Sequence, residues 1–265
     1  NAGLRLPDQA QGGLMSITGA ADDQPGAGPK RVGVAVADLT TGMNATIAIL
    51  GALYHRTQTG EGQHIDLALL DVQVSWLANQ AQNYFCSGEP PTRTGDYHPN
   101  LVPYQPFPTA DDQQIIIAIG NNGQFQSFCE AIGQGELAQD ARFATNAERV
   151  KHRVELIKVL VSATKTRTLK QWTLLLNEIG VPCGPIQDIA QVFDDPQVQA
   201  RGMEVTLDSA RGPVRSVANP IKYSKTAIEY HKAPPTLGED TSAVLERVLQ
   251  KTASEIEALK RKGVV

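Results

Sequence analysis

One carboxylate, Asp38, stands where a short run of small apolar residues meets a longer apolar segment, in VGVAVADLTTGMNATIAILGALYHRTQTGEG at 32–62. The pattern predicts a buried strand followed by a helix, with Asp38 at the joint. An acid is favoured there because the first amides of a helix lack intrahelical partners and form the positive end of the helix dipole. The same position is the usual ligand crevice of an open α/β sheet. On the residues alone, Asp38 is either a capping or first-turn acid or a functional carboxylate.

A second group of polar side chains lies in YHPNLVPYQ, residues 97–105, which contains His98, Asn100, Tyr104 and Gln105. Taken alone, HPN is typical of a turn whose imidazole is hydrogen-bonded. The functional alternative is contact with a substrate, and acid–base work by His98 would be a further step beyond that.

The third stretch is GNNG, formed by Gly120, Asn121, Asn122 and Gly123 between a predicted strand and a predicted helix. Glycine and asparagine tolerate positive φ and asparagine caps helices, so a simple strand-to-helix turn explains the pattern. A loop that covers a reacting group is the functional alternative.

Composition excludes several classes of function. The 265 residues carry a net charge of -4, with no basic excess, which argues against a nucleic-acid partner. No unbroken run of 18 apolar residues exists, so we expect no membrane partner. Cys86, Cys129 and Cys183 are far apart and lack CxxC spacing, which argues against zinc and for a reducing compartment. We expect a cytoplasmic protein, or a mitochondrial one in a eukaryote.

Hydrophobic periodicity predicts an α/β protein whose domains divide at residue 75, with a linker at 76–105, a small α+β domain at 106–190 and a C-terminal segment at 191–265. The first domain should be doubly wound, with a strand at 64–70 after the helix that contains Asp38. The other predicted elements are a helix at 71–86, a strand at 115–120, helices at 123–133, 152–165 and 168–180, a turn at 181–186, strands at 203–207 and 213–217, and final helices.

These motifs occur in a recognisable order. The sequence reads QGGLMSITG, then the Asp38 segment, then YHPNLVPYQPF, IAIGNNGQF, VPCGPI and LGEDT. Over essentially its whole length the chain resembles the family III CoA-transferases, which include formyl-CoA transferase, carnitine-CoA transferase and α-methylacyl-CoA racemase.

The resemblance implies two interlocked protomers, each with a large Rossmann-like domain and a small α+β domain. Relative to that fold, NAGLRLPDQ at the start has neither an initiator methionine nor a capped first helix, so we expect the family's N-terminal segment to be missing here. The resemblance also places the nucleophile at Asp38. A CoA thioester is then a substrate, and no permanently bound cofactor or metal is expected.

For the other motifs the resemblance implies substrate or CoA contact by His98, Asn100, Tyr104 and Gln105. It implies the same for the four GNNG residues, which would also act as a lid over the reacting carboxylate. Glu239 in LGEDT is a motif residue, although a capping carboxylate explains it equally well. The pairing of YHPNLVPYQ with GNNGQF is most similar to the branch that uses succinyl-CoA and dicarboxylic acids.

Two alternatives remain. A racemase in this family needs a histidine and a glutamate where this chain has Leu4 and Asn122, neither of which exchanges protons, so the transferase is favoured. Arg5 stands where many members carry an acid, with no assigned consequence. A non-catalytic chain is the rival from another class.

The remaining basic side chains carry weaker predictions. Arg5, Arg31 and Arg93 could bind a second carboxylate of a substrate, although solvated surface charge is the commoner fate of an arginine. Histidines in polar surroundings with no evident partner receive no role: His55, His64, His152 and His231.

Overall fold

The computed structural model describes residues 5–209 and 211–265. It divides into two compact units, of which unit 1 ends at Ile186 and unit 2 begins at Gln187. The finer division of unit 1 at residues 75 and 105 stays a prediction.

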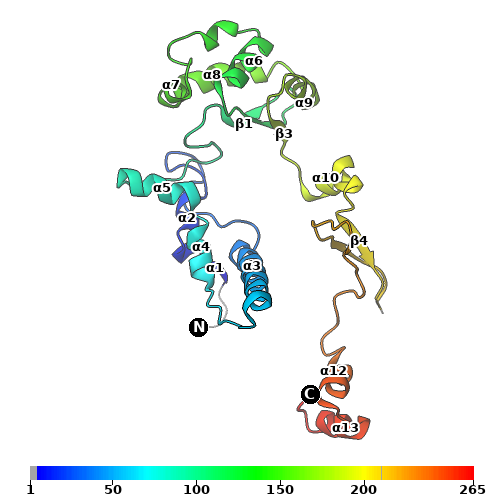
Figure 1. The fold of residues 1–265 in the computed structure, drawn as a ribbon. Coiled ribbons are helices and arrows are strands. Elements are labelled where there is room, and N and C mark those ends of the chain that lie inside the picture. Colours follow the sequence, from blue (N-terminus) through cyan, green and yellow to red (C-terminus); the bar gives the residue numbers. More distant parts are fainter. Residues whose placement is uncertain (1–4, 210) are drawn as a thin grey trace. The chain divides into compact units, whose positions relative to one another are not determined.

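The first half of unit 1 is helical (Figure 1). Its helices are α1 (Arg5–Gln11), α2 (Leu14–Ile17), α3 (Val36–Thr59), α4 (Leu69–Ser75) and α5 (Ala78–Ser87). Helix α3 packs against α4 and α1 near its N-terminus, where Val36, Ala37 and Thr40 are buried.

The predicted strands on either side of α3 are wrong. Residues 32–35 and 61–68 form no strand, and the segment expected as a strand at 64–70 is irregular until α4 begins at Leu69. A strand exists only as part of a hydrogen-bonded ladder, and the described residues of this half of unit 1 provide no partner strand. Alternating apolar residues therefore remain unpaired, and the doubly wound arrangement is not formed by these residues.

The helix predicted at 71–86 is divided into α4 and α5. The break lies at Trp76 and Leu77, and Ala78 has a φ of 45° in the left-handed region. A non-glycine residue seldom adopts this conformation, which apolar periodicity does not reveal.

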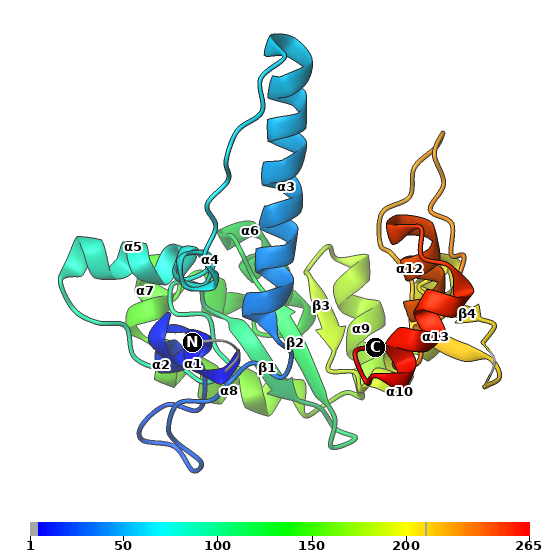
Figure 2. The ribbon, with the colours of Figure 1, turned by 90° about the horizontal axis from the view of Figure 1, so that it is seen from below.

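A three-stranded antiparallel sheet forms the second half of unit 1. Its order is β1 (Tyr104–Pro108), β2 (Gln114–Ala118), β3 (Cys183–Pro185), with Tyr104 opposite Ala118 and Ile117 opposite Cys183. Figures 1 and 2 show its helices gathered on one side of the sheet. They are α6 (Asn122–Ala131), the 3-10 helix η1 (Gly135–Ala138), α7 (Asn146–Lys151), α8 (Arg153–Thr164) and α9 (Leu169–Glu178).

The core of unit 1 lies between this sheet and its helices. Trp172 is fully buried there and its indole N–H donates to the Thr164 carbonyl at 2.6 Å, so its one polar atom is satisfied. The strand predicted at 115–120 and the helices predicted at 123–133, 152–165 and 168–180 are confirmed within a few residues. Fully buried apolar side chains that surround Trp172 include Phe107, Ile115, Ile117, Phe125, Phe128, Leu156, Leu160 and Leu176.

The turn predicted at 181–186 is wrong, because part of VPCGPI forms β3. Glycine and proline suggested a turn, but β3 lies at the edge of the sheet and pairs only with β2. Proline is tolerated on an edge strand, where its missing N–H faces no partner.

Unit 2 contains α10 (Ile189–Asp194), α11 (Pro196–Ala200), a hairpin of β4 (Glu204–Leu207) and β5 (Val214–Val217), α12 (Thr241–Leu249) and α13 (Ala253–Arg261). The two predicted strands and the final helices are confirmed. Asp188 and Thr252 begin α10 and α13 with capping boxes.

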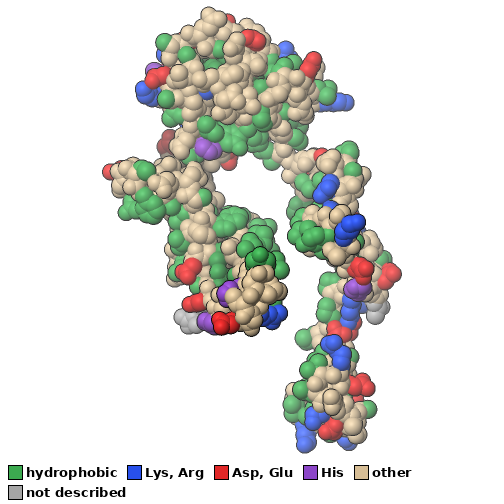
Figure 3. Space-filling view, viewed as in Figure 1, with side chains coloured by type: hydrophobic (Ala, Val, Ile, Leu, Met, Phe, Trp, Pro, Cys, Tyr) green, Lys and Arg blue, Asp and Glu red, His purple; other side chains and the backbone are tan. Residues whose placement is uncertain are grey.

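Most of α3 beyond its first turns is exposed (Figures 2 and 3). An apolar row, the α3 stripe, runs along the helix at intervals of three and four residues, which is the spacing of one helical face. It consists of Leu39, Met43, Ile47, Leu50 and Tyr54.

Helix α3 is also long and apolar enough to cross a membrane by length and composition, since an 18-residue window reaches a mean hydropathy of 1.3. Interrupting polar residues such as Thr46 explain why no unbroken apolar run appears in the sequence. This is weak evidence for a membrane, and the expectation of no membrane partner stays a prediction.

The three cysteines differ in exposure and therefore in expected reactivity. Cys86 is exposed, Cys183 is half-buried with a thiol pKa raised by burial, and burial raises the pKa of the Cys129 thiol to about 12. A raised pKa lowers the thiolate fraction, and the thiolate is the nucleophile. Iodoacetamide at pH 8 should alkylate Cys86 first, Cys183 more slowly and Cys129 only after unfolding. Peptide mass spectrometry with and without denaturant tests this order, and rapid alkylation of Cys129 in the folded chain would contradict the burial.

Candidate active site

Asp38 lies in the first turn of α3. Ala35 occupies the N-cap without a side-chain cap, so Asp38 is the first-turn acid of this helix and not its cap. Its half-buried side chain lies close to the positive end of the helix dipole. The expected joint between a strand and a helix is wrong on the strand side, but the helical half of the prediction is confirmed.

The backbone just before α3 is held by the buried side chain of Gln9. The Val32 N–H donates to Gln9 Oε1 at 3.0 Å, and Gln9 Nε2 donates to the Val34 carbonyl at 3.4 Å. This pair of bonds satisfies backbone groups that no strand partner reaches, and it fixes the approach to Asp38.

His98 and Asn100 form the hydrogen-bonded turn that their types suggested. The Asn100 N–H donates to His98 Nδ1 at 3.1 Å, and the His98 N–H donates to the Tyr104 carbonyl at 2.9 Å. Burial, together with the charge of Arg153, lowers the pKa of His98. The imidazole is therefore neutral at pH 7, with its proton on Nε2, which makes it a hydrogen-bond donor at that atom.

Tyr104 and Gln105 begin β1 beside this turn. The Tyr104 ring lies 5.2 Å from the His98 ring, centroid to centroid, and Gln105 is opposite Ile117 in the ladder. The structure thus brings His98, Asn100 and Tyr104 together, whereas the side chain of Gln105 points to the other face of the sheet from that of Tyr104.

GNNG connects β2 to α6 and is exposed. Asn121 is the N-cap of α6 and its side chain accepts from the Gln124 N–H at 2.9 Å, while the Gly120 N–H donates to Gln124 Oε1 at 2.9 Å. The capping interpretation is confirmed for Asn121. Gly123 follows inside the first turn of α6, where an added Cβ would meet the Asn121 side chain at 3.4 Å.

The turn formed by His98 and Asn100, here called the histidine turn, leads into β1. The residue after β2 is bound to the residue before β1, since the Ile119 N–H donates to the Pro103 carbonyl at 3.0 Å. GNNG and the 97–105 segment are therefore neighbours. Asp38 belongs to α3, whose main contacts are with α4 and α1.

Residues 2–241 match the sequence family described as CoA-transferase family III. The chain belongs to this family. The predicted resemblance is confirmed, and the mixed α/β fold agrees with it.

Several family III relatives are similar over nearly the whole chain. The succinate–glutarate CoA-transferase of Agrobacterium fabrum is 45% identical over 96% of this chain and 63% of its own length. The human succinyl-CoA:glutarate CoA-transferase is 37% identical over 100% of this chain and 59% of its own length. A solved CAIB/BAIF family protein from Brucella suis matches with a TM-score of 0.75 and 43% identity, over 93% of this chain and 63% of that one. The chain therefore spans less than two thirds of the length of these relatives.

Three side chains of α7 and α8 that bind the 97–105 segment were not predicted from the sequence of this family III chain: Asn146, Arg149 and Arg153. Asn146 accepts from the Val102 N–H at 3.2 Å and donates to the Asn100 carbonyl at 2.8 Å. Arg153 donates to the His98 and Pro99 carbonyls at 2.8 and 3.0 Å. Nothing in NAERVKHR itself distinguishes these side chains from solvated ones.

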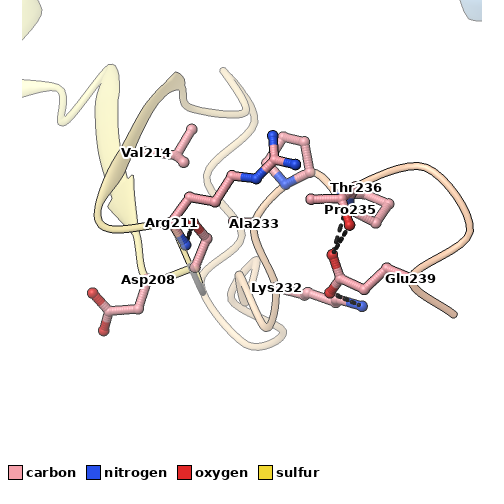
Figure 4. Close-up of a pocket in the computed structure, with 10 residues that line it drawn as sticks. Asp208, Arg211, Val214, Lys232, Ala233, Pro235, Thr236 and Glu239 are labelled. Atoms are coloured by element: carbon pink, nitrogen blue, oxygen red, sulfur yellow. Dashed lines mark hydrogen bonds and ion pairs between the residues drawn. The ribbon is translucent and has the colours of Figure 1, made fainter.

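Glu239 lies in unit 2, at a pocket of about 480 Å³ between the β4–β5 hairpin and the turn before α12 (Figure 4). It accepts from the Thr236 N–H at 2.8 Å and pairs with Lys232 at 2.9 Å. These interactions, the backbone bond foremost, lower the pKa of Glu239 to about 2. The carboxylate binds the backbone of a turn, which fits the capping role predicted for Glu239.

Two of the histidines set aside do have acidic neighbours, which corrects the prediction. His152 Nε2 lies 4.0 Å from a Glu148 carboxylate oxygen, and His231 Nε2 lies 3.3 Å from Glu229. The His152 pair is half-buried and the His231 pair is exposed, and such ion pairs close in sequence at the surface stabilise little. His55 and His64 are exposed.

The arginines also differ from one another. Arg93 is not a solvated charge as predicted, because it pairs with Asp22 and donates to the Ser16 carbonyl at 3.3 Å. Arg31 is exposed, and among the described residues its guanidinium donates to the carbonyls of residues 32 and 33. Leu4 and the side chain of Arg5 lie outside the described residues. Within the part that the structure describes, no group of three acidic, histidine or cysteine side chains could hold a metal ion.

Proposed function

We propose that the protein containing this chain is a CoA-transferase that moves CoA from an acyl-CoA to a carboxylic acid, with a dicarboxylic acid as the acceptor. Family III membership supports the reaction class, and the glutarate-specific names of two relatives support the acceptor class. The observation that carries the mechanism is the Asp38 carboxylate in the first turn of α3.

In the first half-reaction an Asp38 oxygen attacks the thioester carbonyl of the acyl-CoA, the C–S bond breaks and CoA leaves as a thiolate. The product is a mixed anhydride of the acyl group and Asp38. The thiolate then attacks the aspartyl carbonyl, which releases the donor acid and leaves an aspartyl-CoA thioester.

The second half-reaction reverses this order with the acceptor acid. Its carboxylate attacks the aspartyl thioester, CoA thiolate leaves, and a new anhydride forms. Attack of the thiolate on the acceptor's acyl carbonyl gives the new acyl-CoA and regenerates Asp38. No oxidation state changes and no metal is required.

Each step passes through a tetrahedral oxyanion in a site that must exclude water. GNNG is suited to cover such a site because the N–H groups of Asn122 and Gly123, in the first turn of α6, have no partner among the described hydrogen bonds and can donate to an oxyanion. The neutral His98, with its proton on Nε2, can donate to a substrate carboxylate. Asn100 and Tyr104, which lie beside His98, would then contact the same substrate.

A homodimer with an interlocked, Rossmann-like large domain is the proposed assembly. The α3 stripe supports it, because a regular apolar row on an exposed helix is typical of an interface between protein chains.

The runner-up activity is racemisation of a 2-methylacyl-CoA, which moves an α-proton and leaves the thioester intact. Asn122 has no usable pKa, and its side-chain oxygen accepts from Arg149 at 3.1 Å. A proton-exchanging group is therefore absent at this position, which favours the transferase.

Incubation of the full-length protein in deuterium oxide separates the two activities. With a 2-methylacyl-CoA and a dicarboxylate acceptor, CoA should move to the acceptor while the α-position gains no deuterium by NMR. Screening succinyl-CoA and other donors against glutarate and related acids would fix the substrate pair.

Rapid α-deuteration without transfer would overturn the transferase and require another base. A protein that neither transfers CoA nor binds it in calorimetry would instead be the non-catalytic alternative.

A further inference from the structure

Arg149 is fully buried, yet its guanidinium has three hydrogen-bond acceptors. Nε donates to the Val102 carbonyl at 2.7 Å, Nη1 to the Phe143 carbonyl at 2.9 Å and Nη2 to Asn122 Oδ1 at 3.1 Å. The guanidinium carbon also lies 4.3 Å from the centroid of the Phe125 ring.

None of these described acceptors is a carboxylate. Burial lowers the pKa of Arg149, which reflects the cost of holding a cation away from water. A methionine or leucine would fill a core position without that cost. Packing alone therefore does not explain an arginine here.

Its position at α6 is also electrostatically unfavourable. Asn122 and Phe125 lie in the first turns of α6, so the cation is at the positive end of that helix dipole. Arg167 provides the comparison, because it donates to the Ala131 carbonyl at the opposite end of α6 at 3.1 Å and covers the Trp172 ring at 4.8 Å. A guanidinium therefore stabilises α6 at its C-terminal end, where Arg167 lies, and destabilises it at its N-terminal end, where Arg149 lies.

Arg149 joins two fully buried core residues, Val102 and Phe143, to one exposed residue, Asn122. Val102 ends the histidine turn, Phe143 lies in the loop before α7, and Asn122 is an exposed residue of GNNG. Together with the Ile119–Pro103 bond, Arg149 fixes GNNG relative to the histidine turn at both ends of the loop.

We propose that Arg149 is a positioning residue that holds GNNG in the geometry needed to cover the aspartyl intermediates. The inference rests on the transferase function proposed above. The planar guanidinium reaches acceptors in three directions, which a lysine ammonium on a flexible stem does not reproduce.

Arg149→Met tests this role in the full-length protein, with Arg167→Met as the matched control. The expected result is a fall in kcat of about 10- to 100-fold with little change in KM, because a misplaced loop impairs the reaction more than substrate binding. Hydrolysis of the acyl-CoA should also rise relative to transfer, since the loop excludes water. Arg149→Lys should not restore kcat, and Arg167→Met should change neither kcat nor the hydrolysis ratio.

Asn122→Ala keeps the test open if Arg149→Met does not fold. Asn122 is exposed, so its loss removes the contact to Arg149 and leaves the core intact. Gln126→Ala is its control, because Gln126 is an exposed α6 amide that binds only Glu130 among its described hydrogen-bond partners. The Arg149→Met and Asn122→Ala effects on kcat should be non-additive, as expected for one shared interaction.

Amide hydrogen exchange gives a readout that does not depend on activity. Backbone amides at 119–124 should exchange faster in Arg149→Met and Asn122→Ala than in either control. If the wild type transfers no CoA, the proposed function fails while faster exchange still supports the loop restraint. Unchanged exchange, or a kcat and hydrolysis ratio equal to those of Arg167→Met, would overturn the positioning role.

Discussion

Replacing Asp38 with asparagine should lower the rate of CoA transfer by at least about 10³-fold, as expected when a covalent nucleophile is removed. Asparagine keeps the size and most of the hydrogen bonding of the side chain but cannot form the acyl anhydride. The half-buried position of Asp38 in the first turn of α3 makes the substitution mild for folding. Steady-state transfer kinetics with succinyl-CoA and a dicarboxylate measure the effect.

Asp71→Asn is the matched control. Asp71 is the exposed first-turn acid of α4, so it has the same relation to a helix dipole without the proposed chemistry. Its loss should cost only about 0.3–1 kcal/mol of helix stabilisation and leave turnover unchanged. Normal turnover in a folded Asp38→Asn protein would show that the nucleophile lies elsewhere.

The second large effect concerns the α3 stripe. Produced by itself, the 265-residue chain should associate in solution, because five large apolar side chains in a row face water along one helix. Ile47 and Leu50, 68% and 60% exposed, lie in this row. The double substitution Ile47→Glu and Leu50→Glu should reduce association, as measured by light scattering, without unfolding the three-stranded sheet and its helices.

Val154→Glu is the control for that experiment, since Val154 is 70% exposed on α8, outside the stripe. It should leave association unchanged. A stable monomer of the unsubstituted chain would contradict an interface on α3. Partition into phosphatidylcholine vesicles instead of self-association would mean that the stripe faces lipid, as the length and hydropathy of α3 also allow.

Local pattern predicted the elements whose partners are nearby in sequence. Strand β2 and helices α8 and α9 follow from runs such as IIIAI and from apolar spacing, and their packing around Trp172 completes a core within residues 102–183. The segment at 64–70 shows the limit, because alternation indicates a strand only where another strand pairs with it. For β3 the error was opposite: Pro185 suggested a turn, while its place at a sheet edge makes proline acceptable.

The site was predictable to a similar degree. The first-turn position of Asp38 and the turn at His98 and Asn100 follow from residue type and spacing. Arg149 did not, because an arginine in NAERVKHR is normally a solvated charge, and only the tertiary structure places its guanidinium beneath GNNG.

The covalent role of Asp38 can be tested most directly by trapping. Hydroxylamine reacts with anhydrides and thioesters of aspartate but not with the free carboxylate, so it should convert Asp38 to a hydroxamate only when an acyl-CoA is present. Peptide mass spectrometry of the full-length protein, incubated with succinyl-CoA and hydroxylamine, should find this modification at Asp38, and omission of succinyl-CoA should abolish it. Continued CoA transfer with Asp38 unmodified, or a hydroxamate on a different carboxylate, would contradict the proposed mechanism.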